Sequence, residues 1–195
     1  MVQSRAGPFN GRMLWRNELN RLFRQGRTGG CEPVNLAVVG RCIDYTTSTA
    51  LNALDGYGKL SEVLVSTSPN TPPMVSDVDE QLILKVFFLD PVSIVSIQLC
   101  CDAPPDDLEA SKPKTVRLYT NRTEFDFSES DSVIPQHEIV LNEVSVGEKQ
   151  TLKGTKFDRV TSLQIFIVDN LEGKERTYLQ RLILMGTVHR PYPDR

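Results

Sequence analysis

The stretch SDVDEQLILKVFF, residues 76–88, places three carboxylates in its first five positions and then continues as an almost unbroken apolar run. The carboxylates belong to Asp77, Asp79 and Glu80. This pattern is typical of either an acidic site or the solvated start of a strand that is buried further on. Asp side chains readily accept local backbone hydrogen bonds, which suits a turn. We therefore expect these carboxylates to form the turn that begins a strand, at the rim of the fold.

Short β-type runs separated by turn residues continue from this stretch to residue 187. The runs are QLILKVFFL (81–89), VSIVSIQLCC (92–101), KTVRLYTN (114–121), HEIVLN (137–142), SLQIFIVDN (162–170) and TYLQRLILMGT (177–187). In the second run Val95, Ile97 and Leu99 share one face, opposite Ser96 and Gln98. Strands buried on one side and joined by loops too short for crossover helices predict an all-β fold, an antiparallel β-sandwich. A possible helical turn precedes the strands at residues 59–64.

The chain has 195 residues, 39% of them hydrophobic and 24% charged, which is enough for one domain with a substantial core. Its apolar runs are far shorter than the ~20 residues of a membrane-spanning helix, so we expect no membrane span. The four cysteines, at positions 31, 42, 100 and 101, lack the C-x-x-C spacing of zinc knuckles and thiol oxidoreductases. We expect buried free thiols, and neither a metal nor a cofactor.

The sequence offers little for catalysis. Its two histidines, His137 and His189, would have to serve any Ser-His-Asp or Cys-His device. The G-x-S-x-G, Gly-rich phosphate-loop and H-E-x-x-H motifs are missing, and the acidic stretch lacks the central Gly and terminal Glu of a calcium loop. The sequence therefore predicts a protein that is not an enzyme and has no small-molecule substrate.

Residues 1–30 differ in charge from the rest of the chain. They contain six arginines and one acid, Glu18, so they carry +5 and leave −8 for the remainder of a chain whose net charge is −3. Apolar residues recur there at helical spacing. Three interpretations stay open: a disordered or weakly helical basic tail, a docking arm, and a mitochondrial transit peptide. We do not expect nucleic-acid binding, because a sandwich of charge −8 repels phosphate.

Several motifs follow one another in a family-specific order. They are LN (51–52), SDVDEQLIL (76–84), PKTVRLYTN (113–121), FDF (125–127) and LKGTKFDRVTSLQIFIVDNLEGKERTYLQRLILMG (152–186). In this order the chain resembles the PITH domain, which occurs in certain thioredoxin-like proteins and as stand-alone proteins. The resemblance covers roughly residues 44–187 and indicates a stand-alone member without a thioredoxin domain. The family usually has a Cys where this chain has Ala50, so a redox role of that Cys does not transfer.

The resemblance implies a jelly-roll sandwich of the galactose-binding-like type. It also implies a protein-interaction module associated with the proteasome regulatory particle, with no enzymatic activity of its own. We expect three segments: a basic amphipathic arm (1–30), a PITH-like β-sandwich domain (31–187) and a C-terminal tail (188–195).

The predicted function is that of a non-catalytic adaptor that docks on a large protein assembly in the cytoplasm or nucleus. One alternative is an architectural subunit of a mitochondrial or cytoskeletal (axonemal) complex. Another is a sandwich that binds a sugar or calcium, with Tyr119, Phe125 and Phe127 as candidate aromatic contacts. The candidate partner-binding residues are Arg12, Trp15, Arg16, Leu19, Leu22, Phe23, Arg24, Asp77, Asp79 and Glu80.

Overall fold

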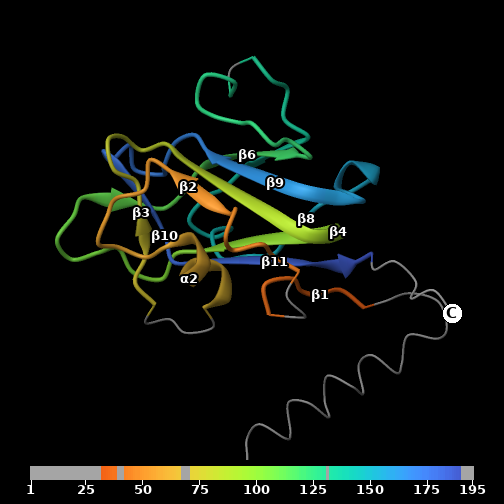
Figure 1. The fold of residues 1–195 in the computed structure, drawn as a ribbon. Coiled ribbons are helices and arrows are strands. Elements are labelled where there is room, and N and C mark those ends of the chain that lie inside the picture. The colour runs from red at the N-terminus through yellow and green to blue at the C-terminus, as the bar shows by residue number, and fades with distance from the viewer. Residues whose placement is uncertain (1–31, 39–41, 67–70, 131, 190–195) are drawn as a thin grey trace, which may run out of the picture. The chain divides into compact units, whose positions relative to one another are not determined.

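The computed structural model describes residues 32–38, 42–66, 71–130 and 132–189 (Figure 1). The strands are β1 (Val34–Asn35), β2 (Thr49–Leu51), β3 (Met74–Val75), β4 (Leu82–Cys100), β5 (Ala110–Ser111), β6 (Thr115–Thr120), β7 (His137–Val140), β8 (Gln150–Thr151), β9 (Val160–Ile167), β10 (Arg176–Leu179) and β11 (Arg181–Val188). The helical elements are α2 (Leu60–Val65), where the sequence predicted a helical turn, and the 3-10 turn η1 (Thr155–Phe157). None of the described helices has the length and apolar character needed to cross a membrane.

Strand β4 connects the two layers of the fold because it pairs with four other strands. The first layer contains the first half of β4, and the second layer contains its second half. Its first half, residues 82–87, pairs antiparallel with β9 on one edge and with β2 on the other. Its second half, from Val92 onward, pairs antiparallel with β11 and β8. Strands β6 and β7 extend the first layer beyond β9, and β1 extends the second beyond β11 (Figure 1). The predicted antiparallel β-sandwich is confirmed.

The sequence predicted two strands, residues 81–89 and 92–101, with a turn at Asp90 and Pro91, and this turn is wrong because β4 runs through both residues as one bent strand (Figure 1). Backbone hydrogen bonds hold the bend on both sides. The Leu89 N–H donates to the Cys42 carbonyl at 2.8 Å, and the Pro91 carbonyl accepts from the His189 N–H at 2.8 Å. Pro91 has no N–H to contribute, which suits a point where the strand exchanges one set of partners for another.

A β-bulge changes which side chains of β4 face the core. The register against β11 shifts at Val95, which has no partner residue in that strand. The inward-facing residues are even-numbered up to Ile94 and odd-numbered from Ile97. Val95 is therefore the extra residue of the bulge, and the prediction that it shares the face of Ile97 is wrong. Gly186 lies across from the bulge, where a side chain would collide with the Ser93 carbonyl.

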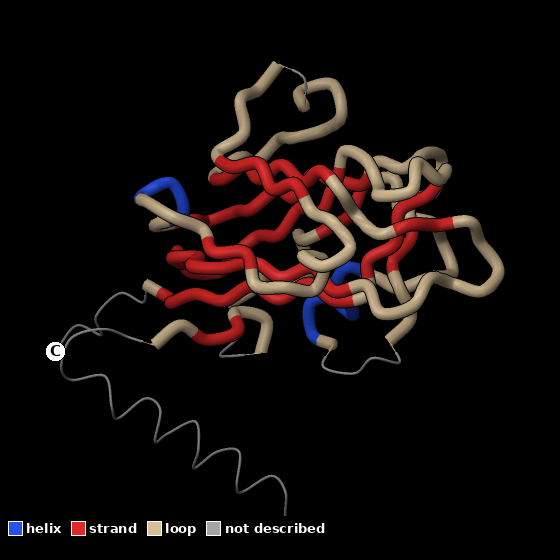
Figure 2. Tube along the Cα trace, turned by 180° about the vertical axis from the view of Figure 1, so that it is seen from behind, coloured by secondary structure: helices blue, strands red, loops and turns tan. Residues whose placement is uncertain are grey.

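Two apolar clusters lie on opposite sides of the first layer. The larger cluster fills the space between the layers and includes the apolar face of α2. The smaller one lies on the outer face, where the loop of residues 121–136 covers it (Figure 2). Its buried members are Ile83, Tyr119, Phe125 and Phe166.

A small sheet, in the order β3-β10-β5, closes one end of the sandwich. Strands β3 and β10 are antiparallel, whereas β10 and β5 are parallel, with Arg176 opposite Ala110. This two-residue parallel pair departs from the purely antiparallel prediction. It brings the loops before β5, after β3 and before β10 to the same end of the fold.

Candidate functional site

The acidic stretch forms a turn that is fixed by the side chain of Asn52. Its Nδ2 donates to Asp79 Oδ1 at 2.8 Å and to the Gln81 carbonyl at 2.7 Å, and its Oδ1 accepts from the Val78 N–H at 3.0 Å. Asp79 Oδ1 also accepts from the Gln81 N–H at 3.0 Å. Asn52 has a φ of 62°, a left-handed conformation that Asn tolerates better than most residues. The carboxylate of Asp79 thus holds the start of β4 in place.

Residues at the start of β10 secure the other side of the same turn. The Thr177 hydroxyl donates to the Glu80 carbonyl at 2.7 Å, and the Thr177 N–H donates to the Ser76 hydroxyl at 2.9 Å. Arg176 Nε donates to the Asp77 carbonyl at 3.1 Å. These contacts use the backbone of the acidic residues and leave their carboxylates at the rim. The prediction that the stretch is the turn preceding a strand is confirmed.

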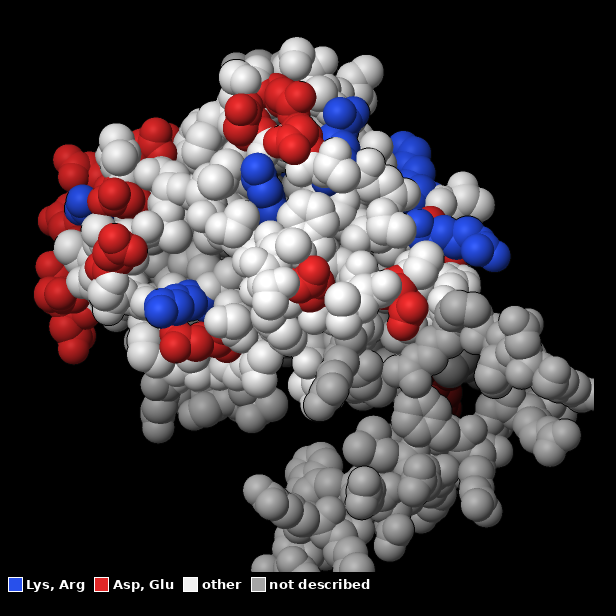
Figure 3. Space-filling model, in the orientation of Figure 1, with Lys and Arg blue, Asp and Glu red and all other residues white. Residues whose placement is uncertain are grey.

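Two further acidic loops lie beside this turn. Residues 102–109 precede β5 and residues 169–175 precede β10, and the pairing of β5 with β10 places them together. The acidic side chains of the three loops are Asp77, Asp79, Glu80, Asp102, Asp106, Asp107, Glu109, Asp169, Glu172 and Glu175. Figure 3 shows acidic side chains gathered at the end of the fold where Figure 1 labels β3 and β10. The sequence showed these loops only as separate turns.

The seven candidate residues of the N-terminal arm, from Arg12 to Arg24, lie outside the described residues. Their role as a docking surface stays a prediction. Within the described part of the chain, no group of three or more His, Cys, Asp or Glu side chains is arranged to hold a metal ion.

The aromatic residues considered for sugar binding pack inside the protein. Tyr119 and Phe125 are 0% and 2% exposed, and their ring centroids lie 4.3 Å apart. Phe127 is half-buried and meets Phe166 edge to face at 5.9 Å. These contacts join the loop of residues 121–136 to the outer face of the first layer. The candidate rings therefore serve packing, because a sugar platform needs an open ring face.

Three side chains resemble a catalytic triad in composition but not in geometry. His189 Nε2 lies 2.6 Å from the Ser93 hydroxyl and 3.0 Å from Asp158 Oδ1, so both partners share one ring nitrogen. In a triad the carboxylate binds Nδ1 and thereby orients the ring toward the serine. Here the Ser93 hydroxyl donates directly to Asp158, and this contact lowers the pKa of that carboxyl. The cluster joins β4 to the start of β9 and the end of β11.

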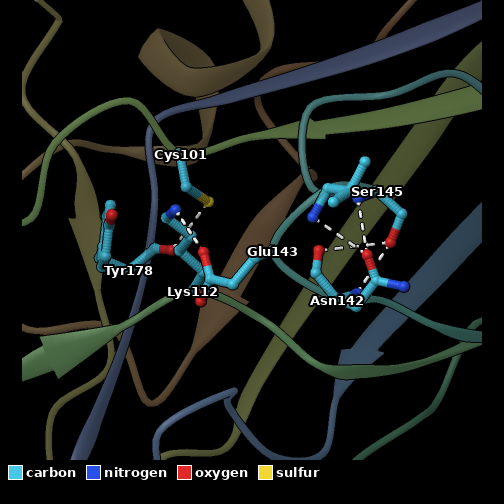
Figure 4. A network of polar contacts seen from close by, with 7 residues as sticks. Cys101, Lys112, Asn142, Glu143, Ser145 and Tyr178 are labelled. Atoms are coloured by element: carbon cyan, nitrogen blue, oxygen red, sulfur yellow. Dashed lines mark hydrogen bonds and ion pairs between the residues drawn. The ribbon is translucent and has the colours of Figure 1, made fainter.

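The described cysteines are buried thiols. Cys42, Cys100 and Cys101 are all buried, as predicted, and Cys31 lies outside the described residues. Burial raises the pKa of the Cys101 thiol, whose Sγ donates to the Tyr178 carbonyl at 3.3 Å (Figure 4). A thiol held in its protonated form is a poor nucleophile and a poor metal ligand. The arrangement gives these side chains a packing role.

Close to Cys101, an ion pair joins the residue after β5 to the loop after β7. Lys112 Nζ lies 2.8 Å from Glu143 Oε2, beside the turn in which Asn142 Oδ1 accepts from the Val144 and Ser145 N–H groups (Figure 4). Both charged side chains are partly exposed, so the pair contributes little free energy. This network orders a loop and contains no reactive group.

Solved structures with the same fold are sugar-binding and related domains at low sequence identity. A fucolectin from Morone saxatilis serum matches with a TM-score of 0.53 and 13% identity, over 79% of this chain and 49% of that one. A putative chitobiase fragment from Bacteroides thetaiotaomicron matches with a TM-score of 0.53 and 9% identity, over 86% and 99%. A family 32 carbohydrate-binding module from Clostridium perfringens, in complex with galactose, matches with a TM-score of 0.50 and 11% identity, over 74% and 98%. They confirm the galactose-binding-like jelly roll.

Sequence comparison identifies the family. Thioredoxin-like protein 1 of Schizosaccharomyces pombe is 33% identical over 149 residues, which are 74% of this chain and 49% of that protein, so this chain spans about half of its relative's length. The sequence profile of the PITH domain matches residues 32–193, which include the acidic turn, both layers and the small sheet. The chain belongs to the PITH domain family.

Proposed function

We propose that this protein is a non-catalytic interaction module that docks on a large protein assembly, the proteasome regulatory particle. Membership of the PITH family carries the proposal, because the resemblance set out above links the domain to that particle. The described polar groups support a non-catalytic role. The Asn52 and Thr177 side chains tie the acidic turn into the fold, and the Ser93, Asp158 and His189 cluster lacks the geometry of a triad.

The experiment is affinity purification of the full chain, tagged at its C-terminus, from its native cells. Mild crosslinking and mass spectrometry then identify the proteins recovered in stoichiometric amounts. We expect subunits of the proteasome regulatory particle. Recovery of mitochondrial or axonemal proteins in their place would support the architectural alternative, and fluorescence of the tagged chain distinguishes that location from the expected cytoplasm and nucleus.

The N-terminal arm is proposed as a second docking element. A chain that starts at residue 31 removes its charge of +5 together with the apolar residues at helical spacing. We expect this truncation to release the protein from its assembly without lowering the midpoint of thermal unfolding. Equal recovery of the assembly with both chains would remove the arm from the docking surface.

A further inference from the structure

Four bases follow one another along the segment that starts just before β8 and leads through η1 to β9. Lys149, Lys153, Lys156 and Arg159 are all exposed, and together they form what we name the basic strip. Residues 149–159 contain one acid, Asp158, so the segment carries +3 on a domain that is otherwise acidic. Blue side chains gather at the corresponding end of Figure 3, away from the acidic loops.

No carboxylate of the described chain forms an ion pair with the basic strip. The ion pairs among the described residues involve none of its four bases. Asp158 is occupied by the Ser93 hydroxyl and by His189. Lys156 Nζ donates to a neutral group, the Gln136 carbonyl, at 3.4 Å. The charge of the strip is therefore available to a binding partner.

The backbone of Arg159 is held in an unfavourable conformation. Its φ of 51° lies in the left-handed region, where Gly and Asn are preferred. The neighbours Phe157 and Val160 are buried in the core, and the chain bends between them. An exposed side chain gains little packing in return for this conformation. Packing therefore does not explain an Arg at position 159, whereas binding through its guanidinium would. Backbone strain of this kind is common at functional positions.

One exposed apolar side chain lies near a residue that contacts the strip. Ile134 is 87% exposed and stands two residues before Gln136, whose carbonyl contacts Lys156. A partner that matches this surface carries several carboxylates and one apolar side chain. Nucleic acid fits less well, because binders of single strands add aromatic platforms and the one aromatic residue of the strip, Phe157, is buried.

We infer that the basic strip, with Ile134 beside it, is the surface that binds an acidic segment of a protein partner. The inference rests on the proposed function and deepens it, since it names both the docking surface and the chemistry of the partner. Charge complementarity of this kind accelerates association and selects partners.

The test measures binding of fluorescein-labelled peptides to the full chain by fluorescence anisotropy. The probes are a 15-residue peptide of Glu, Asp, Gly and one central Leu, the same peptide with Gln and Asn in place of the acids, and a 15-nucleotide oligo-dT. We expect the acidic peptide to bind, more weakly as salt rises, and the amide peptide not to bind. Tighter binding of the oligonucleotide than of the acidic peptide would overturn the inference in favour of nucleic acid.

Matched variants locate the binding surface. Replacing Lys153 and Lys156 by Gln is expected to weaken binding of the acidic peptide roughly threefold to tenfold, as removal of two exposed charges does. The control replaces two exposed bases elsewhere, Lys59 and Lys114, and is expected to change affinity less than twofold, roughly the size of a long-range charge effect. An equal loss in both variants would show that net charge and not the strip governs binding.

The arm of residues 1–30 also carries positive charge, so it needs its own control. A variant with its six arginines replaced by Gln is expected to keep the strip's affinity for the acidic peptide. If that variant loses all binding, the inference fails.

Arg159→Asn separates binding from folding. Asn suits a left-handed backbone, so we expect the midpoint of thermal unfolding to stay the same or rise while affinity for the acidic peptide falls. Unchanged affinity would exclude Arg159 from the surface.

Capture of the assembly distinguishes this inference from the proposed function. If the strip variants still recover the proteasome particle, the proposed function holds and the surface is wrong. If the unaltered chain recovers no proteasome subunits but binds the acidic peptide through the strip, the surface holds and the proposed assembly is wrong.

Discussion

Replacing Asn52 by Ala should destabilise the fold by removing the side chain that fixes the acidic turn. The hydrogen bonds to Asp79 Oδ1, the Gln81 carbonyl and the Val78 N–H are lost, together with a longer one of 3.4 Å from Nδ2 to the Asp79 carbonyl. Each contributes about 0.5–1.5 kcal/mol net, toward the lower end here because the turn is partly exposed. Ala at a φ of 62° adds about 1 kcal/mol of backbone strain that Asn tolerates better. We expect a total loss of roughly 2–4 kcal/mol in the free energy of unfolding.

Urea unfolding followed by circular dichroism measures this loss, and two further variants divide it. Asn52→Gly removes the same hydrogen bonds without the strain, so it should cost about 1 kcal/mol less than Asn52→Ala. Asp79→Asn keeps an oxygen acceptor for Asn52 and Gln81, so we expect a change below about 0.5 kcal/mol. The reasoning is refuted if Asn52→Ala unfolds within about 0.5 kcal/mol of the unaltered chain, the range of an ordinary surface substitution.

Three other features of the fold give measurable expectations. Gly186→Ala should cost roughly 1–3 kcal/mol in urea unfolding, because the new methyl group would collide with the Ser93 carbonyl; an unchanged midpoint would mean that the bulge is not tightly packed. Cys101 should react with iodoacetamide at pH 8 more than about tenfold slower than a free thiol, by site-resolved mass spectrometry, because burial raises its pKa; rapid labelling of the native protein would contradict this. Hydrogen bonds, of which that from the Thr46 hydroxyl has the largest effect, lower the pKa of Asp44 from 3.8 to about 2. The ionised carboxylate therefore stabilises the folded state above the unfolded pKa, and this stabilisation is lost as the pH falls from the unfolded pKa to the folded one. The difference in melting temperature between the chain and Asp44→Asn should therefore shrink between about pH 4 and pH 2, and a constant difference would refute this.

The architecture could be predicted from the sequence because it depends on alternation. A strand that buries one face leaves apolar residues at every second position. Such a strand can be recognised without knowing any contact between residues far apart in the sequence. The bend and bulge of β4 could not be predicted in this way. Both depend on which strands lie beside β4, and the extra residue at Val95 is visible only against its neighbour β11. The apolar run at residues 92–101 gives no local signal for a register shift.

The acidic turn was predictable because its chemistry is local, whereas its surroundings were not. Asp79 accepts the N–H group two residues ahead, a contact typical of Asp in a turn. The loop of residues 102–109 joins it only through the parallel pairing of β5 with β10, which are more than 60 residues apart in sequence. The basic strip did carry a sequence signal, four bases in 11 residues, but only the structure shows that they lack acidic partners.

The bend in β4 separates the two kinds of charge. Because the strand turns back on itself, its start and its end lie at the same end of the sandwich, and the acidic loops that flank it come together there. The bend itself lies at the other end, where Val92 pairs with Val160 and so places Arg159, the last residue of the basic strip, nearby. An acidic partner is then attracted to one end of the domain and repelled by the other (Figure 3). One strand thus determines the orientation in which such a partner approaches, before any side chain makes contact.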